Sequence, residues 1–377
     1  MLKCNTGIET IRAGRTPTNN ADQEASDIVD ITDILARDRP AIDAEMRAVI
    51  GDRDLPVFDM ARYALGWLDA DGNPHPGSAG KGLRPVLCLL SAEAIDASPE
   101  ARARALAGAA AVELVHNYSL VHDDIQDGDE ERHHNPTVWV QWGMPQAINV
   151  GDALRELAQI ALQRARDAGA PATTVLDAYQ LLNNASLEMI EGQYLDLAYE
   201  RQPAVGPREY LDMVERKTGA MIGCSMALGA LLASNDCAAA DHFNRAGRRL
   251  GLCFQIRDDA LGIWGDQAMT GKSAGNDIRR RKKSYPIVHA LRTADLDDRV
   301  ALDRIYRPAD VSDADVKDAD IDTVMRILDQ IDARQATELA AQQQFDAFHQ
   351  ELDGCALSPT SLATFTNIAE FILQRDL

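Results

Sequence analysis

Apolar residues recur at intervals of three and four along most of the chain, and this spacing constrains the fold more than any other feature. The pattern starts near Ile34, Ile42, Met46 and Ile50. It continues through stretches 83–97, 101–124, 147–168, 173–199, 207–233, 238–263, 286–293 and 321–351. Such a period places apolar side chains on one face of an α-helix. Sustained alternation of β-branched residues is missing, so we predict an all-α protein without a sheet.

Three segments interrupt the helical period. Residues 1–26 are polar, which predicts a disordered tail. Residues 69–80 are dense in Gly, Pro and Asp and predict a loop, as does the acidic segment 308–321 before two closing helices. We expect one domain over residues 27–377, built as a large orthogonal helix bundle around a central cavity.

The acidic balance of the chain excludes one class of function. Its 377 residues include 38 Lys and Arg against 59 Asp and Glu, a formal net charge of −21. A general nucleic-acid binder needs clustered basic residues, so we expect no nucleic-acid partner. A phosphate ligand would need a local basic pocket or a bridging cation.

The cysteine and hydropathy patterns favour a cytoplasmic protein. The six cysteines are scattered without a CxxC pair or zinc-type spacing, which predicts reduced thiols. Residues 1–15 lack the apolar core of a signal peptide. The longest weakly polar run, 219–233, is shorter than the ~20 residues of a membrane span, so we expect no stable membrane insertion.

Two clusters of aspartates are the strongest chemical signal. Asp123, Asp124 and Asp127 form one cluster, and Asp258 and Asp259 form the other, each near the expected C-terminal end of a helix. Asp123 and Asp127 share a helix face, where like charges repel and the helix dipole adds to the cost. Hard oxygen ligands of this kind suit Mg²⁺. A solvated acidic helix end is the alternative reading of either cluster alone.

Basic residues occur where an acidic protein would need them to bind an anion. Lys81 and Arg84 are three residues apart at an expected helix start, which favours phosphate. Lys217 lies in an apolar setting, Lys272 follows the second aspartate cluster, and residues 279–283 form the strongest basic run. Together with the carboxylates they outline a site for a diphosphate bridged by Mg²⁺.

The order of these motifs resembles the trans-isoprenyl diphosphate synthases of the polyprenyl synthetase family. The resemblance covers about residues 78–293. It rests on GKGLRP (80–85), HNYSLVHDDIQD (116–127), PTVW (136–139), INVGDAL (148–154), EGQYLDL (191–197), KTGAMIG (217–223), FQIRDD (254–259), GIWGD (262–266) and GKSAGNDIRRRKKS (271–284). It implies the all-α isoprenoid synthase fold and a prenyltransferase that condenses isopentenyl diphosphate with an allylic diphosphate.

The same resemblance implies the metal ligands. About three Mg²⁺ ions would bind between the two aspartate motifs. The principal ligands would be Asp123, Asp127 and Asp258, with Asp124 and Asp259 in support. A homodimer is also expected from the family.

The substrate contacts are likewise implied by the resemblance. The allylic diphosphate would be bound by Arg132, Lys217 and Lys272, with Lys282 and the pair Gln193 and Asp196 nearby. Isopentenyl diphosphate would be bound by Lys81, Arg84 and His116. Thr218 and Gln255 would face the reacting carbons.

Two departures from the family pattern concern substrate and metal binding. His133 stands where the family has a second arginine that binds isopentenyl diphosphate, so we hypothesise weakened binding of that substrate through a largely neutral imidazole. Gly262 replaces the third aspartate of the second motif, which leaves fewer carboxylates there.

An aromatic side chain is expected to set the product length. Tyr118 lies five residues before Asp123, about one and a half turns down the same helix. A bulky residue there should stop chain growth early, which predicts products of C15 to C20, with geranylgeranyl diphosphate favoured over farnesyl diphosphate. The alternative is that Tyr118 is a core aromatic without a gating role.

Two other functions stay open at this stage. A terpene cyclase or lyase on the same scaffold is suggested by the missing second arginine, and Lys81, Arg84 and His116 argue against it. A regulatory subunit of a heteromeric synthase is the non-enzymatic alternative, and the persistence of both aspartate motifs argues against it.

Overall fold

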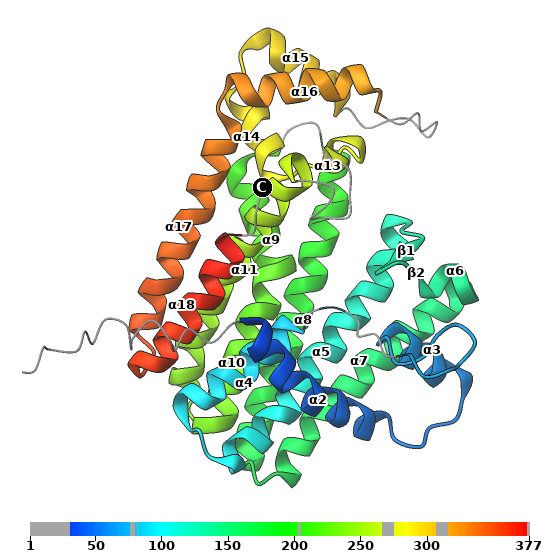
Figure 1. The fold of residues 1–377 in the computed structure, drawn as a ribbon, viewed down its shortest axis with the longest axis vertical. Helices are drawn as coiled ribbons and strands as arrows, with labels where there is room; N and C mark the ends of the chain where they lie inside the picture. Colours follow the sequence, from blue (N-terminus) through cyan, green and yellow to red (C-terminus); the bar gives the residue numbers. More distant parts are fainter. Residues whose placement is uncertain are drawn as a thin grey trace, which may run out of the picture.

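Helices make up nearly all of the structure, a computed structural model that describes residues 31–75, 80, 82–202, 205–265, 275–306 and 316–374. In chain order the elements are α2 (Ile31–Ile50), α3 (Pro56–Ala64), α4 (Leu83–Ile95), α5 (Pro99–Asp127), β1 (Glu131–Arg132), β2 (Asn135–Pro136), α6 (Val138–Trp142), α7 (Met144–Asp167), α8 (Ala172–Glu200), α9 (Pro207–Val214), the π-helix η1 (Glu215–Gly219), α10 (Ala220–Ser234), α11 (Cys237–Trp264), α13 (Asn276–Arg279), α14 (Tyr285–Thr293), α15 (Leu296–Ile305), α16 (Asp318–Gln330), α17 (Ala333–Asp353) and α18 (Pro359–Leu373). Figure 1 shows α14, α15 and α16 gathered at one end of the long helices. The all-α prediction is confirmed.

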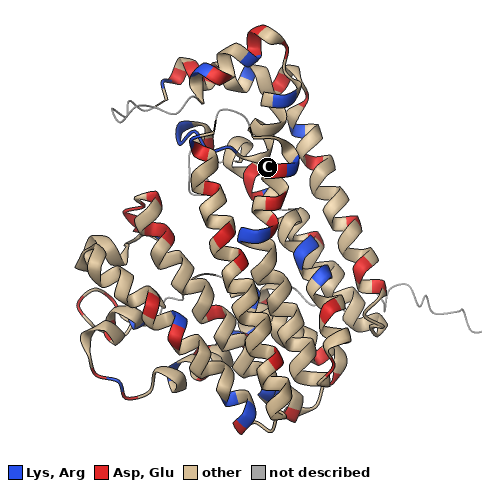
Figure 2. Cartoon of the chain, turned by 180° about the vertical axis from the view of Figure 1, so that it is seen from behind, with Lys and Arg blue, Asp and Glu red and all other residues tan. Residues whose placement is uncertain are grey.

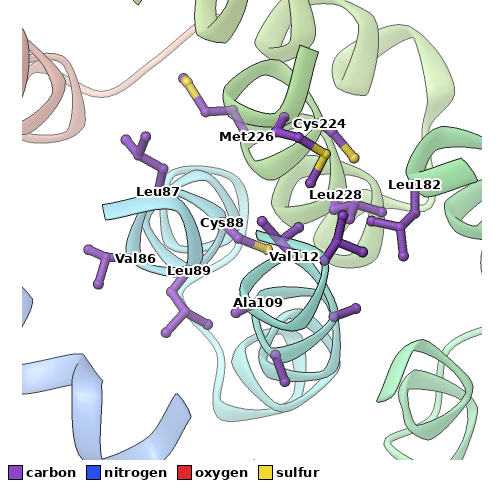
Figure 3. Close-up of a cluster of buried hydrophobic side chains, with 14 of the residues drawn as sticks. Val86, Leu87, Cys88, Leu89, Ala109, Val112, Leu182, Cys224, Met226 and Leu228 are labelled. Atoms are coloured by element: carbon purple, nitrogen blue, oxygen red, sulfur yellow. The ribbon is translucent and has the colours of Figure 1, made fainter. Parts of the chain in front are cut away.

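The centre of the core is α10, whose side chains from Ala220 to Ala233 are all buried. It packs against α4, α5, α8 and α11. Glycine allows its closest approach to α4, since a Cβ on Gly229 would lie 1.9 Å from the carbonyl oxygen of Cys88. Figure 3 shows Cys88 of α4, Val112 of α5 and Leu228 of α10 in this part of the core. The contact fixes α4, and Arg84 lies in the first turn of that helix.

Residues at the ends of α5 set its length. The hydroxyl of Ser98 accepts a hydrogen bond from the backbone N–H of Ala101, which caps the first turn. Gly128 ends the helix in the left-handed conformation, with φ 67°. The first aspartate cluster therefore lies in the last two turns of α5, as predicted.

The apolar segment around α10 is a core element. Residues Pro207–Ser234 form the one described stretch that is long and apolar enough to cross a membrane, and 89% of its most apolar window is buried inside the protein. That degree of burial is typical of a central helix in a folded domain. The segment was expected as one α-helix over 207–233, but the π-turn Glu215–Gly219 interrupts it.

Four sequence expectations need correction. The expected helix 321–351 is broken after Gln330, where Asp332 adopts a left-handed φ of 51° before α17 begins. Residues 318–321 belong to α16 and not to the expected acidic loop. A two-residue antiparallel pair, β1 with β2, exists where no strand was expected. The helix α3 was not anticipated, while the tail 1–26 and residues 308–315 lie outside the described residues.

The approach of α10 to α4 predicts that Gly229→Ala destabilises the protein. The new methyl group would overlap the Cys88 carbonyl, which belongs to helix backbone, so the helices must separate. Overpacking of this kind costs about 1–3 kcal/mol or more. Urea unfolding should show this loss. The control Gly206→Ala should cost less than about 1 kcal/mol, because its methyl meets only the flexible Glu209 side chain. Equal stabilities of the two variants would contradict the prediction.

Candidate active site

The last turns of α5 carry two carboxylates beside a half-buried lysine. Asp123 and Asp127 both interact electrostatically with Lys217 of η1. Burial raises the pKa of Asp123 to about 6, with Lys217 opposing and Asp127 adding to the rise. Burial also raises the pKa of Asp127. Because protein groups do not fully stabilise the negative charge of either carboxylate, the pair is suited to bind a cation.

A π-helical turn positions this lysine. The π-turn Glu215–Gly219 holds one residue more than an α-turn, a feature common at functional sites. Lys217 Nζ donates a hydrogen bond to Asp196 Oδ2 at 2.5 Å. Burial disfavours the ammonium, but Asp196 and Asp123 outweigh it and raise the pKa of Lys217. Gly192 of α8 permits this contact, since a Cβ there would lie 2.2 Å from the Lys217 backbone nitrogen.

The second aspartate pair, on α11, is split between two environments. Asp258 is exposed, whereas Asp259 has no exposed surface. The two oxygens of Asp259 accept four hydrogen bonds, from the Tyr210 hydroxyl, the Tyr285 backbone N–H, Gln255 Nε2 and Lys282 Nζ. Asp258 is therefore the member of the pair that is open to a ligand.

Asp124 of α5 is buried in the same way as Asp259. Its Oδ1 accepts from Arg132 Nε at 2.7 Å, and Lys282 Nζ lies 3.3 Å from Asp259. A protein cation engages each of these two carboxylates, Arg132 at Asp124 and Lys282 at Asp259, and each buried aspartate orients that basic side chain. Their supporting metal role stays a prediction.

The two aspartate clusters lie close enough to interact with the same charged side chains. Asp196 interacts electrostatically with Lys217 and also with Lys282, and Lys282 in turn interacts with Asp258. Burial disfavours the Lys282 ammonium, but Asp259 and Asp277 outweigh it and raise its pKa. The sequence-predicted residues of both motifs are therefore brought together at this end of the bundle.

The expected polar pairs lie next to these clusters. Thr218 Oγ1 donates to Gln255 Oε1 at 3.1 Å, which links η1 to α11 beside Asp259. Gln193 Nε2 donates to Gln126 Oε1 at 2.9 Å, which links α8 to the end of α5. These contacts fix the polar side chains close to Lys217.

A second basic group forms between α4 and α5. Arg84 Nη1 lies 3.2 Å from His116 Nε2. Burial, followed by Arg84, Arg132 and His133, holds the pKa of His116 well below its ordinary value. Burial and Arg132 also lower the pKa of His133, in agreement with the expected neutral imidazole. A Cβ on Gly80 would lie 3.9 Å from His133 Nε2, so Gly80 adjoins this group.

The basic run 279–283 is not an open phosphate-binding patch. Its arginines contact protein groups: Arg279 with Asp318, Arg280 with Asp129, and Arg281 with the Ile305 carbonyl. Lys283 donates to backbone carbonyls at the end of α8. Figure 2 shows acidic residues on most helices, so such pairing is available on many sides. Two predicted ligands, Lys81 and Lys272, lie outside the described residues.

Asp277 is a site residue that the sequence reasoning missed. A Cβ on Gly262 would lie 2.4 Å from Asp277 Oδ2, so the Asp277 carboxylate fills the space where a third aspartate of the second motif would begin. Asp277 Oδ2 also lies 3.8 Å from Lys282 Nζ. The carboxylate that position 262 lacks is thus supplied from α13. The signal available in the sequence was an aspartate five residues before Lys282.

Tyr118 lies below the first aspartate cluster, as expected. Its ring is buried and meets His122 edge-on, with 5.1 Å between the ring centroids. Burial raises the pKa of its hydroxyl, on which Arg155 and Asp152 of α7 also act. The aromatic ring therefore ends near charged groups of the neighbouring helix.

A cavity of about 190 Å³ lies between α3, α5 and the β1–β2 pair. Its wall includes Asp124, Arg132 and His133, with Tyr63 and Val138 from the surrounding segments. The cavity thus adjoins the cation Arg132 and the neutral His133.

The carboxylates fit a divalent cation that takes part of its ligands from a substrate. Among the described residues, no three His, Cys, Asp or Glu side chains converge closely enough to hold a metal ion by themselves. Asp123 and Asp127 nevertheless supply hard oxygens from α5, and Asp258 supplies them from α11. Diphosphate oxygens would complete such a coordination shell.

Comparison with known proteins identifies the family. The model of the polyprenyl synthetase family matches residues 70–323. The chain belongs to the polyprenyl synthetase family. A geranylgeranyl diphosphate synthase of Mycobacterium tuberculosis is 43% identical over 250 residues, which are 65% of this chain and 68% of the relative. A geranylgeranyl diphosphate synthase of Saccharolobus solfataricus is 33% identical over 299 residues, 79% of this chain and 87% of the relative.

Solved structures agree with this assignment. The crystal structure of polyprenyl synthetase from Streptomyces coelicolor A3(2) has a TM-score of 0.82 and 37% identity, covering 91% of this chain and 99% of that chain. The expected isoprenoid synthase fold and the resemblance to trans-isoprenyl diphosphate synthases are confirmed.

Burial of Asp123 in this polyprenyl synthetase predicts a pH-dependent cost of folding. Its pKa of about 6 lies above the ordinary 3.8. Below pH 4 the carboxyl is protonated in both states, and its burial then costs the folded state no charge. As the pH rises through 6 the buried carboxyl ionises, and the free energy of unfolding falls. Asp123→Asn should therefore raise the free energy of unfolding at pH 8 by about 2 kcal/mol without divalent cations, and leave it unchanged at pH 4.

Urea unfolding with a chelator at the two pH values measures this difference. Asp241→Asn, at an exposed position of α11, is the control and should show no dependence on pH. A loss of stability in Asp123→Asn at pH 8 would refute the argument.

Proposed function

We propose that this trans-prenyltransferase condenses isopentenyl diphosphate with an allylic diphosphate to give a C15–C20 diphosphate. One observation carries the proposal: carboxylates gather around Lys217, and Arg84 pairs with His116 in a separate group. The carboxylates would bind an anion through bound cations, and Arg84 with His116 would bind a second anion directly. Two such sites suit two diphosphate substrates. Relatives named geranylgeranyl and (2E,6E)-farnesyl diphosphate synthase support it.

Magnesium is the cofactor that we propose. Asp123, Asp127 and Asp258 would hold about three Mg²⁺ ions together with the allylic diphosphate. Bound there, the ions neutralise the charge of the leaving diphosphate. The uncompensated burial of Asp123 supports this role.

Basic side chains stabilise the leaving group during ionisation. Lys217, Arg132 and Lys282, with Lys272, donate to the allylic diphosphate as its C1–O bond breaks and negative charge develops on oxygen. Asp196 and Asp259 hold two of these lysines in place. Thr218 and Gln255 face the reacting carbons, and the apolar helices exclude water from the allylic cation.

The second substrate supplies the electrons for the new bond. Isopentenyl diphosphate, bound by Lys81, Arg84 and His116, attacks the allylic C1 through its double bond. A proton then leaves C2 of the isopentenyl unit for the departing diphosphate, so one carbon–carbon bond forms and one diphosphate is released. We infer that binding of this substrate is weakened by the neutral His133.

The two alternatives receive less support. The relatives give no support to a terpene cyclase or lyase, and the pairing of Arg84 with His116 preserves a second anion site. A regulatory subunit would have no need of Lys217 held between three carboxylates.

Product analysis tests the proposal. Purified protein with Mg²⁺, isopentenyl diphosphate and each allylic diphosphate should yield longer prenyl diphosphates, and Lys217→Ala should lower the rate by about 100-fold or more. Lys317→Ala, an exposed lysine before α16, is the control and should match the wild type. Hydrocarbons or alcohols would indicate a cyclase or lyase, and no product at all would indicate a regulatory subunit.

Tyr118 is the proposed limit on chain length, with geranylgeranyl diphosphate as the favoured product. Its ring is buried on α5, five residues before Asp123, where it would block the growing prenyl chain. We predict that Tyr118→Ala produces chains longer than C20, because the growing prenyl group gains room. Chromatography of the dephosphorylated products measures the shift. Tyr179→Ala, from the α7–α8 contact, is the control, and an unchanged product spectrum in Tyr118→Ala would exclude the gate.

A homodimer is proposed from an apolar face on α7 and α8. Exposed large apolar side chains line these two helices: Met144, Ile148, Ile160, Leu176, Leu187, Ile190 and Tyr194. Helices α7 and α8 pack on each other, so these residues lie on two neighbouring helices. Exposed apolar side chains gathered on neighbouring elements are typical of a protein interface.

Sedimentation velocity tests the dimer. Leu187→Glu should convert dimers to monomers because it places a charge in the interface. Leu296→Glu, which changes an even more exposed leucine on α15, should stay dimeric. A monomeric wild type, or a dimeric Leu187→Glu variant, would contradict the proposed interface.

A further inference from the structure

A largely buried arginine of α2 lies next to the start of α4. Arg39 Nη1 lies 3.3 Å from Glu113 Oε1 of α5. The same nitrogen lies 3.0 Å from the position that a Cβ on Gly82 would take. The Arg39 side chain is 14% exposed and that of Glu113 is 1% exposed, so this ion pair forms inside the protein.

Glu113 interacts with two arginines from different helices. Arg39 and Arg84 both stabilise its ionised form against the effect of burial. Glu113 is one helical turn before His116, which contacts Arg84 at 3.2 Å. If Arg39 were absent, Glu113 would draw its compensation from Arg84, since a buried carboxylate without a partner is costly.

Gly82 adds a steric reason for the same arrangement. It precedes α4 in the left-handed conformation, with φ 65°, and the Arg39 guanidinium occupies the space next to its missing side chain. Arg39 therefore packs against the backbone that leads into Arg84.

We infer that Arg39 is a positioning residue for the isopentenyl diphosphate site, which it serves through Glu113 and Gly82 without touching substrate. It compensates Glu113, and this leaves the Arg84 guanidinium available to the diphosphate. The inference rests on the proposed function, in which Arg84 and His116 bind that substrate. Nothing in the family motifs points to α2.

Steady-state kinetics of the full chain tests the inference. Arg39→Met should raise the KM for isopentenyl diphosphate by about tenfold, with kcat and the allylic KM changed less than about twofold. Arg39→Lys keeps the charge and should recover most of the affinity. The control is Arg37→Met on the same helix, whose partners are Asp38 and Glu93; it should lose stability but keep the KM.

Several outcomes would overturn the inference. An unchanged KM for isopentenyl diphosphate in Arg39→Met contradicts it, and so does an equal loss for both substrates, which indicates a general structural role. If Arg39→Met does not fold, Gly82→Ala takes its place, because its methyl group displaces Arg39 and should raise the same KM. A wild type without condensation activity would refute the proposed function instead.

Discussion

The burial of carboxylates at one end of an apolar helix bundle is the constraint on which the rest of the structure depends. Burying such charges costs several kcal/mol each unless they are paired, and the chain meets this cost in two ways. Asp124 and Asp259 bind protein cations, Arg132 and Lys282. Asp123 lacks full compensation, and a cation from solution can supply it. Neighbouring aspartates of one motif thus differ in role: Asp124 orients a basic side chain, and Asp123 is open to a cation.

The fold followed from the sequence wherever helices are long and amphipathic. The apolar period from Ile34 onward and the Ala-rich segments were sufficient to predict these helices, because burial of one face dominates helix stability. The π-turn at Glu215 and the break at Asp332 were not predictable, since neither changes the apolar period enough to be seen. The two-residue pair β1 with β2 is too short to leave a pattern.

The site was predictable where the motif itself carries the chemistry, and less so where tertiary packing assigns the role. Spacing placed Asp123 and Asp127 on one face. It did not reveal that Asp259 is turned into the core, because this depends on Tyr210 and Lys282, which come from other elements. The role of Arg39 was not predictable for a related reason, because its partners Glu113 and Gly82 lie far along the chain and no local sequence pattern links them to it. The net charge of the chain also did not predict the charge of the site, because lysines and aspartates pair with one another there.

The π-turn has a consequence for how this chain can diverge. The π-turn takes up its extra residue within one turn, so α9 and α10 keep about the phase that a regular helix would give them. Removing one residue from Glu215–Gly219 would restore regular α-winding and leave Tyr210 facing Asp259. The change would fall on the turn itself, where Lys217 would lose its direction toward Asp196. A single-residue deletion here would therefore alter the site while the packing of the two helices stays the same.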